Sequence, residues 1–271
     1  MRQSPKMSRQ GNRGFTLVEM VTVIIILGIL VVGVSSFVIL GTRIFVESSS
    51  VDQVLSQSRF VIERMTRELR NALPNSIRVD KSSDAQCIEF MPITASASYI
   101  SLPIAPDSAA SSGSVMLPAQ GINLNYKIVV YPLSPGQIYQ DTPSTTQGRI
   151  FNVKQLSGNQ LEFDNPLRFD EASPQRRYFM VNGAVSYCFL GSGDIRRYEG
   201  YGGQTSQPTS SQMGAGALMG QHVVNNLSSE APIHYTPGTL TNNAVVQLSP
   251  RFEVNGQTFQ YQHQVQVINV P

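Results

Sequence analysis

Residues 14–40 read GFTLVEMVTVIIILGILVVGVSSFVIL, and this stretch decides the fold of the chain. From residue 20 to residue 40 there are 21 positions without a charged side chain or a proline. An α-helix needs about 20 apolar residues to cross the roughly 30 Å hydrocarbon layer of a bilayer. The stretch therefore predicts one membrane-spanning helix, and we expect the rest of the chain to be organised behind this anchor.

Two charged features frame the apolar run. A short basic tail without acidic residues precedes it, and Glu19 lies at its N-terminal end, five residues after Gly14. The basic residues of the tail are Arg2, Lys6, Arg9 and Arg13. Because a carboxylate within a membrane segment is costly, its presence there indicates a function. The simpler alternative is a plain single-pass anchor in which Glu19 lies near the lipid headgroups.

The order of basic tail, Gly14, Phe15, Glu19 and apolar run resembles the leader and methylation signature of type IV prepilins and type II secretion pseudopilins. The resemblance implies that residues 1–14 are a leader peptide. An inner-membrane prepilin peptidase would remove it after Gly14 and methylate the new N-terminal amine of Phe15. The resemblance also implies an assembly role for Glu19. Its carboxylate would meet the N-terminal ammonium of a neighbouring subunit, where two charges that are each costly in lipid neutralise one another.

The charge distribution indicates an exported head that does not bind nucleic acid. Residues 75–271 carry 11 basic and 13 acidic side chains and no run of Lys or Arg, which argues against a phosphate-binding face. Four positive charges precede the span, and only Arg43 lies just beyond it. By the positive-inside rule the N-terminus stays in the cytoplasm. We therefore expect a single-pass inner-membrane protein with a periplasmic head.

The chain has two cysteines, Cys87 and Cys188, and both lie in the expected head. In an oxidising compartment a single disulfide between them is the natural pairing. Two separate buried thiols are the alternative.

The hydrophobic pattern changes after residue 40. The stretch before it is uniformly apolar, whereas residues 41–73 have apolar residues on one side of a helix only. Apolar or small residues recur there at steps of three and four, which predicts an amphipathic helix with one buried face. The residues expected on that face are Val51, Val54, Leu55, Ser58, Ile62, Met65, Leu69 and Ala72. Proline is absent from residues 15–73 and is found at Pro74, a helix boundary. We expect one helix over 15–73, with 15–40 in the membrane or filament core and 41–73 packed on the head.

Beyond Pro74 short β-type runs replace the helical period, so residues 74–271 are expected to form a β-rich globular head. The expected strands are 76–80, 86–93, 122–131, 148–156, 160–164, 178–181, 184–190, 194–198, 244–254 and 257–270. Strand 122–131 and the last strand alternate apolar and polar residues, which predicts one buried face for each.

Turn chemistry and composition divide these strands. Asn182-Gly183 and Asn255-Gly256 predict two-residue hairpins, because both central residues of a type I′ turn need positive φ. Weaker turn signals lie at residues 157–158 and 191–193. Residues 94–114 are rich in Ser, Ala and Pro, and residues 200–220 in Gly, Ser and Gln, so both are expected to be surface loops or poorly ordered insertions.

A long N-terminal helix followed by mostly antiparallel strands is an α+β arrangement, and the resemblance implies the type IV pilin fold. Three further stretches are similar to the J/W group of minor pilins, and within that group to those of mannose-sensitive haemagglutinin (MSHA) pilus biogenesis. They are residues 58–70 (SRFVIERMTRELR), residues 181–198 with VNGAVSYC and RRY, and the ending VQVINVP at 265–271. This similarity implies a low-abundance subunit that helps to start filament assembly, near the tip.

We expect no enzymatic activity, no cofactor and no metal. The three histidines are scattered, and no HExxH, phosphate loop or GxSxG pattern is present. A carboxylate cluster at Asp164, Asp170 and Glu171 would form only if folding brought these residues together. Six tyrosines in or near predicted loops, which could form a sugar-binding surface, are more often packing residues. They are Tyr99, Tyr131, Tyr139, Tyr198, Tyr201 and Tyr235.

Three functions therefore stand as hypotheses. The first is a minor type IV pilin whose partners are other pilins, prepilin peptidase and the inner-membrane assembly platform, and which joins a pilus at the cell surface. The second is a type II secretion minor pseudopilin, built on the same anchor. The third is a tip adhesin whose head binds a surface ligand while the helix serves as a tether.

Overall fold

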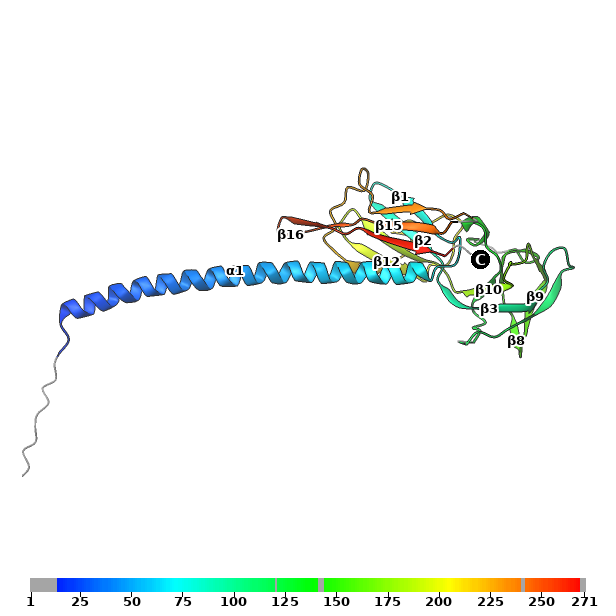
Figure 1. The fold of residues 1–271 in the computed structure, drawn as a ribbon, viewed down its shortest axis with the longest axis horizontal. Coiled ribbons are helices and arrows are strands. Elements are labelled where there is room, and N and C mark those ends of the chain that lie inside the picture. Colours follow the sequence, from blue (N-terminus) through cyan, green and yellow to red (C-terminus); the bar gives the residue numbers. More distant parts are fainter. Residues whose placement is uncertain (1–13, 120, 141–143, 240–241, 269–271) are drawn as a thin grey trace, which may run out of the picture. The chain divides into compact units, whose positions relative to one another are not determined.

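The computed structural model of the chain describes residues 14–119, 121–140, 144–239 and 242–268. The chain divides into two compact units, residues 1–51 and residues 52–271. One long helix is followed by strands that pair almost entirely antiparallel (Figure 1). The expected α+β class and the pilin-like architecture are therefore confirmed.

Helix α1 (Leu17–Arg70) contains 54 residues and runs unbroken through the three glycines of its first part. It ends with two tightened turns, in which the amides of Asn71 and Ala72 donate to the carbonyls three residues earlier. Pro74 follows this end. The helix predicted over 15–73 is thus confirmed, with each end two or three residues inside the expected bounds.

The part of α1 within the second unit buries one stripe of side chains. The buried residues of α1 are Val54, Ser58, Val61, Ile62, Met65, Thr66 and Leu69. Val51 and Leu55, expected on this face, are half-buried. Val61 and Thr66 were not expected on it. Thr66 is tolerated there because its hydroxyl donates to the carbonyl of Ile62 at 2.7 Å.

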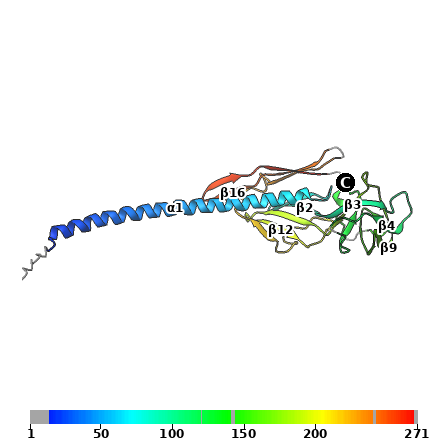
Figure 2. The ribbon, with the colours of Figure 1, turned by 60° about the horizontal axis from the view of Figure 1, so that its bottom comes forward.

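Two antiparallel sheets enclose a core with this stripe. The first has the order β1 (Arg78–Lys81), β2 (Ala85–Phe90), β11 (Val185–Leu190), β12 (Ile195–Glu199) and β13 (Ala217–Gly220). The second has the order β14 (Ile233–Thr236), β15 (Ala244–Leu248) and β18 (His263–Val267). Both lie alongside the C-terminal part of α1 (Figure 2) and contribute apolar residues to one cluster with it. A hairpin of β16 (Arg251–Val254) and β17 (Gln257–Gln260) adjoins this core through Phe252.

A third sheet is inserted between two neighbouring strands of the first. Strands β2 and β11 pair with each other, yet the chain between them builds an eight-stranded sheet with a separate apolar cluster. Its strands are β3 (Ile93–Ser101), β4 (Ala110–Val115), β5 (Lys127–Val129), β6 (Gln147–Gly148), β7 (Ile150–Asn152), β8 (Gln155–Ser157), β9 (Gln160–Phe169) and β10 (Arg177–Val181), with a 3-10 turn η1 (Pro135–Gln137). Residues 93–181 therefore form a nested module.

Two loop predictions need correction. The predicted loop 94–114 is wrong, because β3 and most of β4 lie there. Ser and Ala have a weak preference for β-strands. They form β3 and β4 because each of these strands pairs with a neighbouring strand on both sides, and this backbone pairing compensates for the weak preference. The predicted loop 200–220 is wrong at its end, where β13 pairs with β12.

The prediction of a long alternating strand over 122–131 is also wrong. Only Lys127–Val129 form a strand, and the three successive residues Ile128, Val129 and Val130 are all buried. The reason is that β5 lies between β10 and β7 with apolar clusters on both faces, so neither face points to solvent.

Other predicted strands were placed well but divided differently. Residues 148–156 are split among β6, β7 and β8, and residues 244–254 are broken at Ser249-Pro250 between β15 and β16. The last strand is split into β17 and β18, with residues 269–270 outside the described residues. The strand expected at 160–164 extends to Phe169 as β9. The remaining strand predictions are confirmed within a few residues.

Of the two strong hairpin predictions, one is confirmed. Asn255 and Gly256 have φ of 52° and 76° and connect β16 to its partner β17. The hairpin predicted at Asn182-Gly183 is wrong, because β10 and β11 belong to different sheets and the chain crosses between them there. Both weaker turn signals, at 157–158 and 191–193, do connect paired strands.

The structure has a disulfide between Cys87 and Cys188. The two residues are direct partners in the register of β2 and β11, with Cα atoms 4.1 Å apart. The bond therefore joins the two strands between which the nested module is inserted, 101 residues apart in sequence.

A buried ion pair attaches a loop to the first sheet. Glu89 is fully buried, and the guanidinium of Arg78 donates to one of its oxygens while the Tyr201 hydroxyl donates to the other at 3.0 Å. Arg78 also donates to the carbonyls of Gln204 and Thr205, at 2.7 and 2.6 Å. Every charged atom involved has a partner, which is the condition under which a buried ion pair is tolerated.

We expect removal of the disulfide to destabilise the head strongly. In chain-entropy terms, opening a loop of this length costs up to about 5 kcal/mol. The double variant Cys87→Ala, Cys188→Ala should unfold at a lower urea concentration in detergent solution, and reduced wild-type protein should shift by a similar amount. Equal midpoints for oxidised and reduced wild-type protein would contradict the prediction.

We also expect Glu89 to make stability depend on pH. Burial raises the pKa of its carboxyl above the ordinary 4.5, against the opposing effect of Arg78. The folded state then keeps the proton at a pH where the unfolded state has lost it. The contribution to stability is therefore present below pH 4.5 and falls as pH rises through the folded-state pKa.

The measurement is urea unfolding of wild type and Glu89→Gln across this pH window. Since Gln does not titrate, wild type should lose stability relative to the variant as pH rises. If the unfolding free energies of the two proteins changed with pH in parallel, Glu89 would have the same pKa in the folded and unfolded states, and the prediction would be wrong.

Candidate assembly site at the N-terminal anchor

The segment from Gly14 to Glu19 leads into the first turn of α1. Gly14 and Phe15 precede the helix, and both are exposed. A Cβ atom placed on Gly14 would meet nothing within 4 Å. Among the described residues, no contact therefore requires glycine at position 14.

Thr16 caps the helix, a feature absent from the expectations drawn from the sequence. Its hydroxyl accepts a hydrogen bond from the backbone N–H of Glu19 at 3.3 Å, and its carbonyl accepts from Met20 at 3.2 Å. Thr16 and Glu19 have the spacing of a capping box, the signal that could have revealed the helix start. Glu19 thus lies in the first turn, where the helix dipole favours a negative charge.

From residue 20 to residue 40, α1 has no charged side chain on any side and is exposed. The helix is long and apolar enough to cross a membrane, and none of its most apolar stretch is buried. The hydroxyls of Thr22, Ser36 and Thr42 each donate to a carbonyl one turn back, at 2.8–2.9 Å. These polar groups are therefore satisfied within the helix, as a lipid or protein environment without water requires.

The head offers little that resembles a catalytic or metal centre. In the described part of the chain, no three His, Cys, Asp or Glu side chains gather where they could hold a metal ion. The three carboxylates considered as a cluster are divided between two cations. Asp164 lies 3.9 Å from Lys154, while Asp170 and Glu171 lie 3.8 and 3.0 Å from Arg149.

Four of the six tyrosines considered as a sugar-binding surface are packed within the head. Tyr99, Tyr139 and Tyr198 are buried, in three different apolar clusters. Tyr201 is half-buried, and its hydroxyl donates a hydrogen bond to the carboxylate of Glu89. These side chains are therefore packing residues, the commoner role of tyrosines at strand ends.

Comparison with known proteins bears on the anchor alone. Residues 9–35 match the family described as the prokaryotic N-terminal methylation motif. No curated protein and no solved structure gave a significant match. The matched residues include Gly14, Phe15, Glu19 and most of the apolar run, and the fold behind them is one long helix with a mostly antiparallel β-domain. The chain therefore carries a prokaryotic N-terminal methylation motif, as type IV prepilins do, in front of a pilin-like α+β fold.

Proposed function

We propose that this protein is a minor type IV pilin, which helps to start pilus assembly in the inner membrane and takes a place near the tip. Cleavage after Gly14 would release the leader, and Phe15 would become the methylated N-terminus. The similarity of residues 58–70 and 181–198 to the J/W group, and there to the O protein of MSHA pilus biogenesis, supports this subfamily.

One observation carries the proposal. The two parts of α1 differ in burial, since none of the most apolar window is covered, while the part beyond Val51 buries a stripe in the head. An uncovered apolar surface of this extent needs lipid or other apolar helices around it. A subunit that moves from the membrane into a filament exchanges surrounding lipid for the apolar helices of other subunits.

The proposed orientation rests on charge and on the disulfide. Arg2, Lys6, Arg9 and Arg13 precede the span, which favours a cytoplasmic N-terminus. A head with a Cys87–Cys188 disulfide fits the periplasm, because disulfides persist in oxidising compartments.

Within an assembling filament, Glu19 would lie against the methylated ammonium of Phe15 in an adjoining subunit. Each charge alone is costly in an apolar environment, and the pair is less so. A subunit at the extreme tip has no subunit ahead of it, and pilins thought to cap the tip often lack this acid. The presence of Glu19 therefore favours a place just beneath the cap.

We expect prepilin peptidase to cut between Gly14 and Phe15. Mass spectrometry of the membrane-extracted protein should give a first peptide that begins with N-methylated Phe15. Substitution of Gly14 by a bulky residue should leave an anchored precursor that does not join filaments, because the cleavage site lies beside the new side chain. An intact leader in wild-type cells with active peptidase would refute the processing step.

We expect Glu19→Val to be inserted, cleaved and folded, yet to enter filaments poorly and reduce pilus number. Loss of one member of a buried charge pair costs roughly 3–5 kcal/mol, less at a hydrated membrane face. The helix cap should survive, since Thr16 accepts from the backbone of residue 19 and not from its side chain. Pili counted by electron microscopy provide the measurement.

Two variants serve as controls. Glu19→Asp keeps the charge with shorter reach and should be milder. Glu47→Val removes an exposed carboxylate of the same helix beyond the apolar run and should assemble normally. Pili at wild-type number in Glu19→Val cells, with the variant co-purifying with its neighbours, would disprove the charge-pairing account.

Cross-linking in membranes distinguishes a pilin from a secretion pseudopilin. A minor pilin should co-purify with other pilins, and its deletion should reduce pilus number without loss of secreted proteins. Co-purification with pseudopilins, together with a secretion defect, would replace the pilus role by the secretion role.

A further inference from the structure

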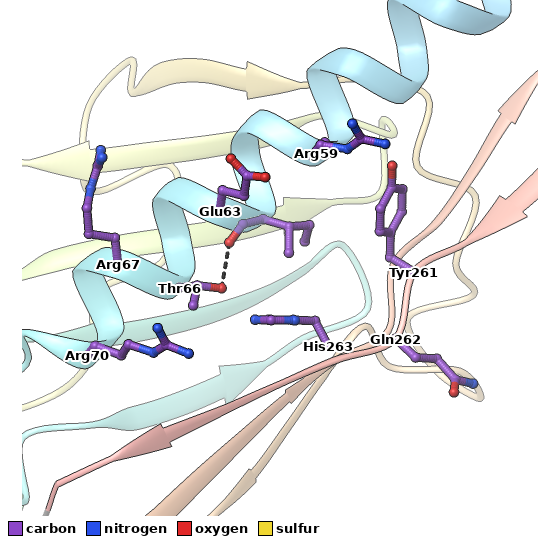
Figure 3. Close-up of a pocket in the computed structure, with 9 residues that line it drawn as sticks. Arg59, Glu63, Thr66, Arg67, Arg70, Tyr261, Gln262 and His263 are labelled. Atoms are coloured by element: carbon purple, nitrogen blue, oxygen red, sulfur yellow. Dashed lines mark hydrogen bonds between the residues drawn. The ribbon is translucent and has the colours of Figure 1, made fainter.

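A groove runs between α1 and the strand at the margin of the second sheet. We call it the α1–β18 groove, and its volume is about 590 Å³. One wall is a stripe of α1, and the other consists of Tyr261, Gln262 and His263 (Figure 3). The α1 wall contains Arg59, Ile62, Glu63, Thr66, Arg67 and Arg70. A second hollow of about 760 Å³ shares Arg70 and is lined by Gln264, Gln266 and Ile268.

Strand β18 is an edge strand without the usual protection. Among the described strands it pairs with β15 alone, so one side of its backbone lacks a strand partner. Its sequence, HQVQV, has no Lys, Arg, Asp, Glu or Pro. Edge strands normally carry such residues to prevent pairing with another chain. The outer strand of the first sheet, β1, does so with Arg78, Asp80 and Lys81.

The opposite wall of the groove is basic. Arg59, Arg67 and Arg70 are exposed, and within the described residues none of them forms an ion pair with a carboxylate. Glu63 is the single acid of the wall. Other arginines of the second unit, such as Arg197, do have acidic partners. The groove therefore presents a net positive charge that the described chain does not neutralise.

Two polar groups in the groove differ in whether they have a hydrogen-bond partner. The hydroxyl of Thr66 donates to the carbonyl of Ile62, as the dashed line in Figure 3 shows. The Nε2 atom of His263 points toward α1, is buried, and has no hydrogen-bond partner among the described residues. At one end, the Tyr261 hydroxyl donates to the carbonyl of Leu55 at 3.3 Å and fixes the strand side to the helix.

The two walls are also similar in length. Arg59 and Arg70 are separated by about 16 Å along α1, at about 1.5 Å per residue. From His263 to Val267, β18 extends over about 13 Å, at about 3.3 Å per residue. An added strand of similar length on β18 would therefore lie beside most of the row of arginines, and its alternate side chains would face them.

We propose that the α1–β18 groove binds an extended acidic segment of a partner protein, which adds a strand to β18 and places its carboxylates against Arg59, Arg67 and Arg70. Backbone pairing with β18 supplies affinity, and the arginines select acidic over basic sequences. The proposal does not depend on the role of Glu19, since it rests on residues of the second unit.

The test uses the full-length protein in detergent and a short fluorescent peptide in which glutamate alternates with valine. Anisotropy should show binding that weakens with salt, as expected for exposed charge pairs. The same peptide with lysine in place of glutamate should not bind. A version N-methylated at every second backbone amide, made in both registers, should lose affinity in the register whose amides face β18.

Variants locate the site on the protein. Arg67→Glu with Arg70→Glu should weaken the acidic peptide by at least about tenfold, equivalent to about 1.4 kcal/mol. Arg176→Glu with Arg177→Glu changes two exposed arginines at the start of β10 by the same charge and should leave binding unchanged. Thermal unfolding of both double variants verifies that they are folded.

Three outcomes would overturn the proposal. Equal binding of both N-methylated registers would exclude strand addition. An equal loss of affinity in the two double variants would show non-specific attraction to net charge. Tighter binding of a short single-stranded oligonucleotide, abolished by Arg67→Glu with Arg70→Glu, would assign the groove to phosphate backbones instead of peptide.

Discussion

The head depends on the packing of one helical stripe against two sheets. Val61, Met65 and Leu69 of α1 are fully buried in a cluster with residues from both the β11 sheet and the β15 sheet. An ion pair at 2.9 Å between Glu68 and Arg197 on β12 fixes the position of the helix against the strands. Since most stability of such a helix comes from tertiary packing, disruption of this stripe would separate the sheets.

The nested module is joined to the rest of the head by more than its two chain connections. It has its own apolar cluster, and its connections to the first sheet leave β2 and enter β11, which pair with each other and are closed by the Cys87–Cys188 disulfide. A further cluster packs residues of the module, among them Val129 and Phe179, against Leu73, which follows α1. Changes within residues 93–181 are therefore separate from the helix–sheet core only away from this cluster.

The uncovered surfaces explain why the protein would need partners of two kinds. No described residue covers the apolar part of α1, so it needs lipid or other apolar helices around it. The α1–β18 groove combines an unprotected strand edge with arginines that have no acidic partner in the described chain. The first surface requires only apolar neighbours, whereas the second selects by backbone geometry and charge.

The sequence by itself determined the anchor, the long helix, the α+β class and most strand positions, because these follow from local hydrophobic period, turn residues and length. Only the tertiary structure decided which strands pair. It showed residues 94–114 as β3 and β4, and buried Ile128, Val129 and Val130 together, since neighbouring strands from distant parts of the sequence cover them. The groove depends on the same fact, because Arg67 and His263 lie far apart in sequence and meet only after folding.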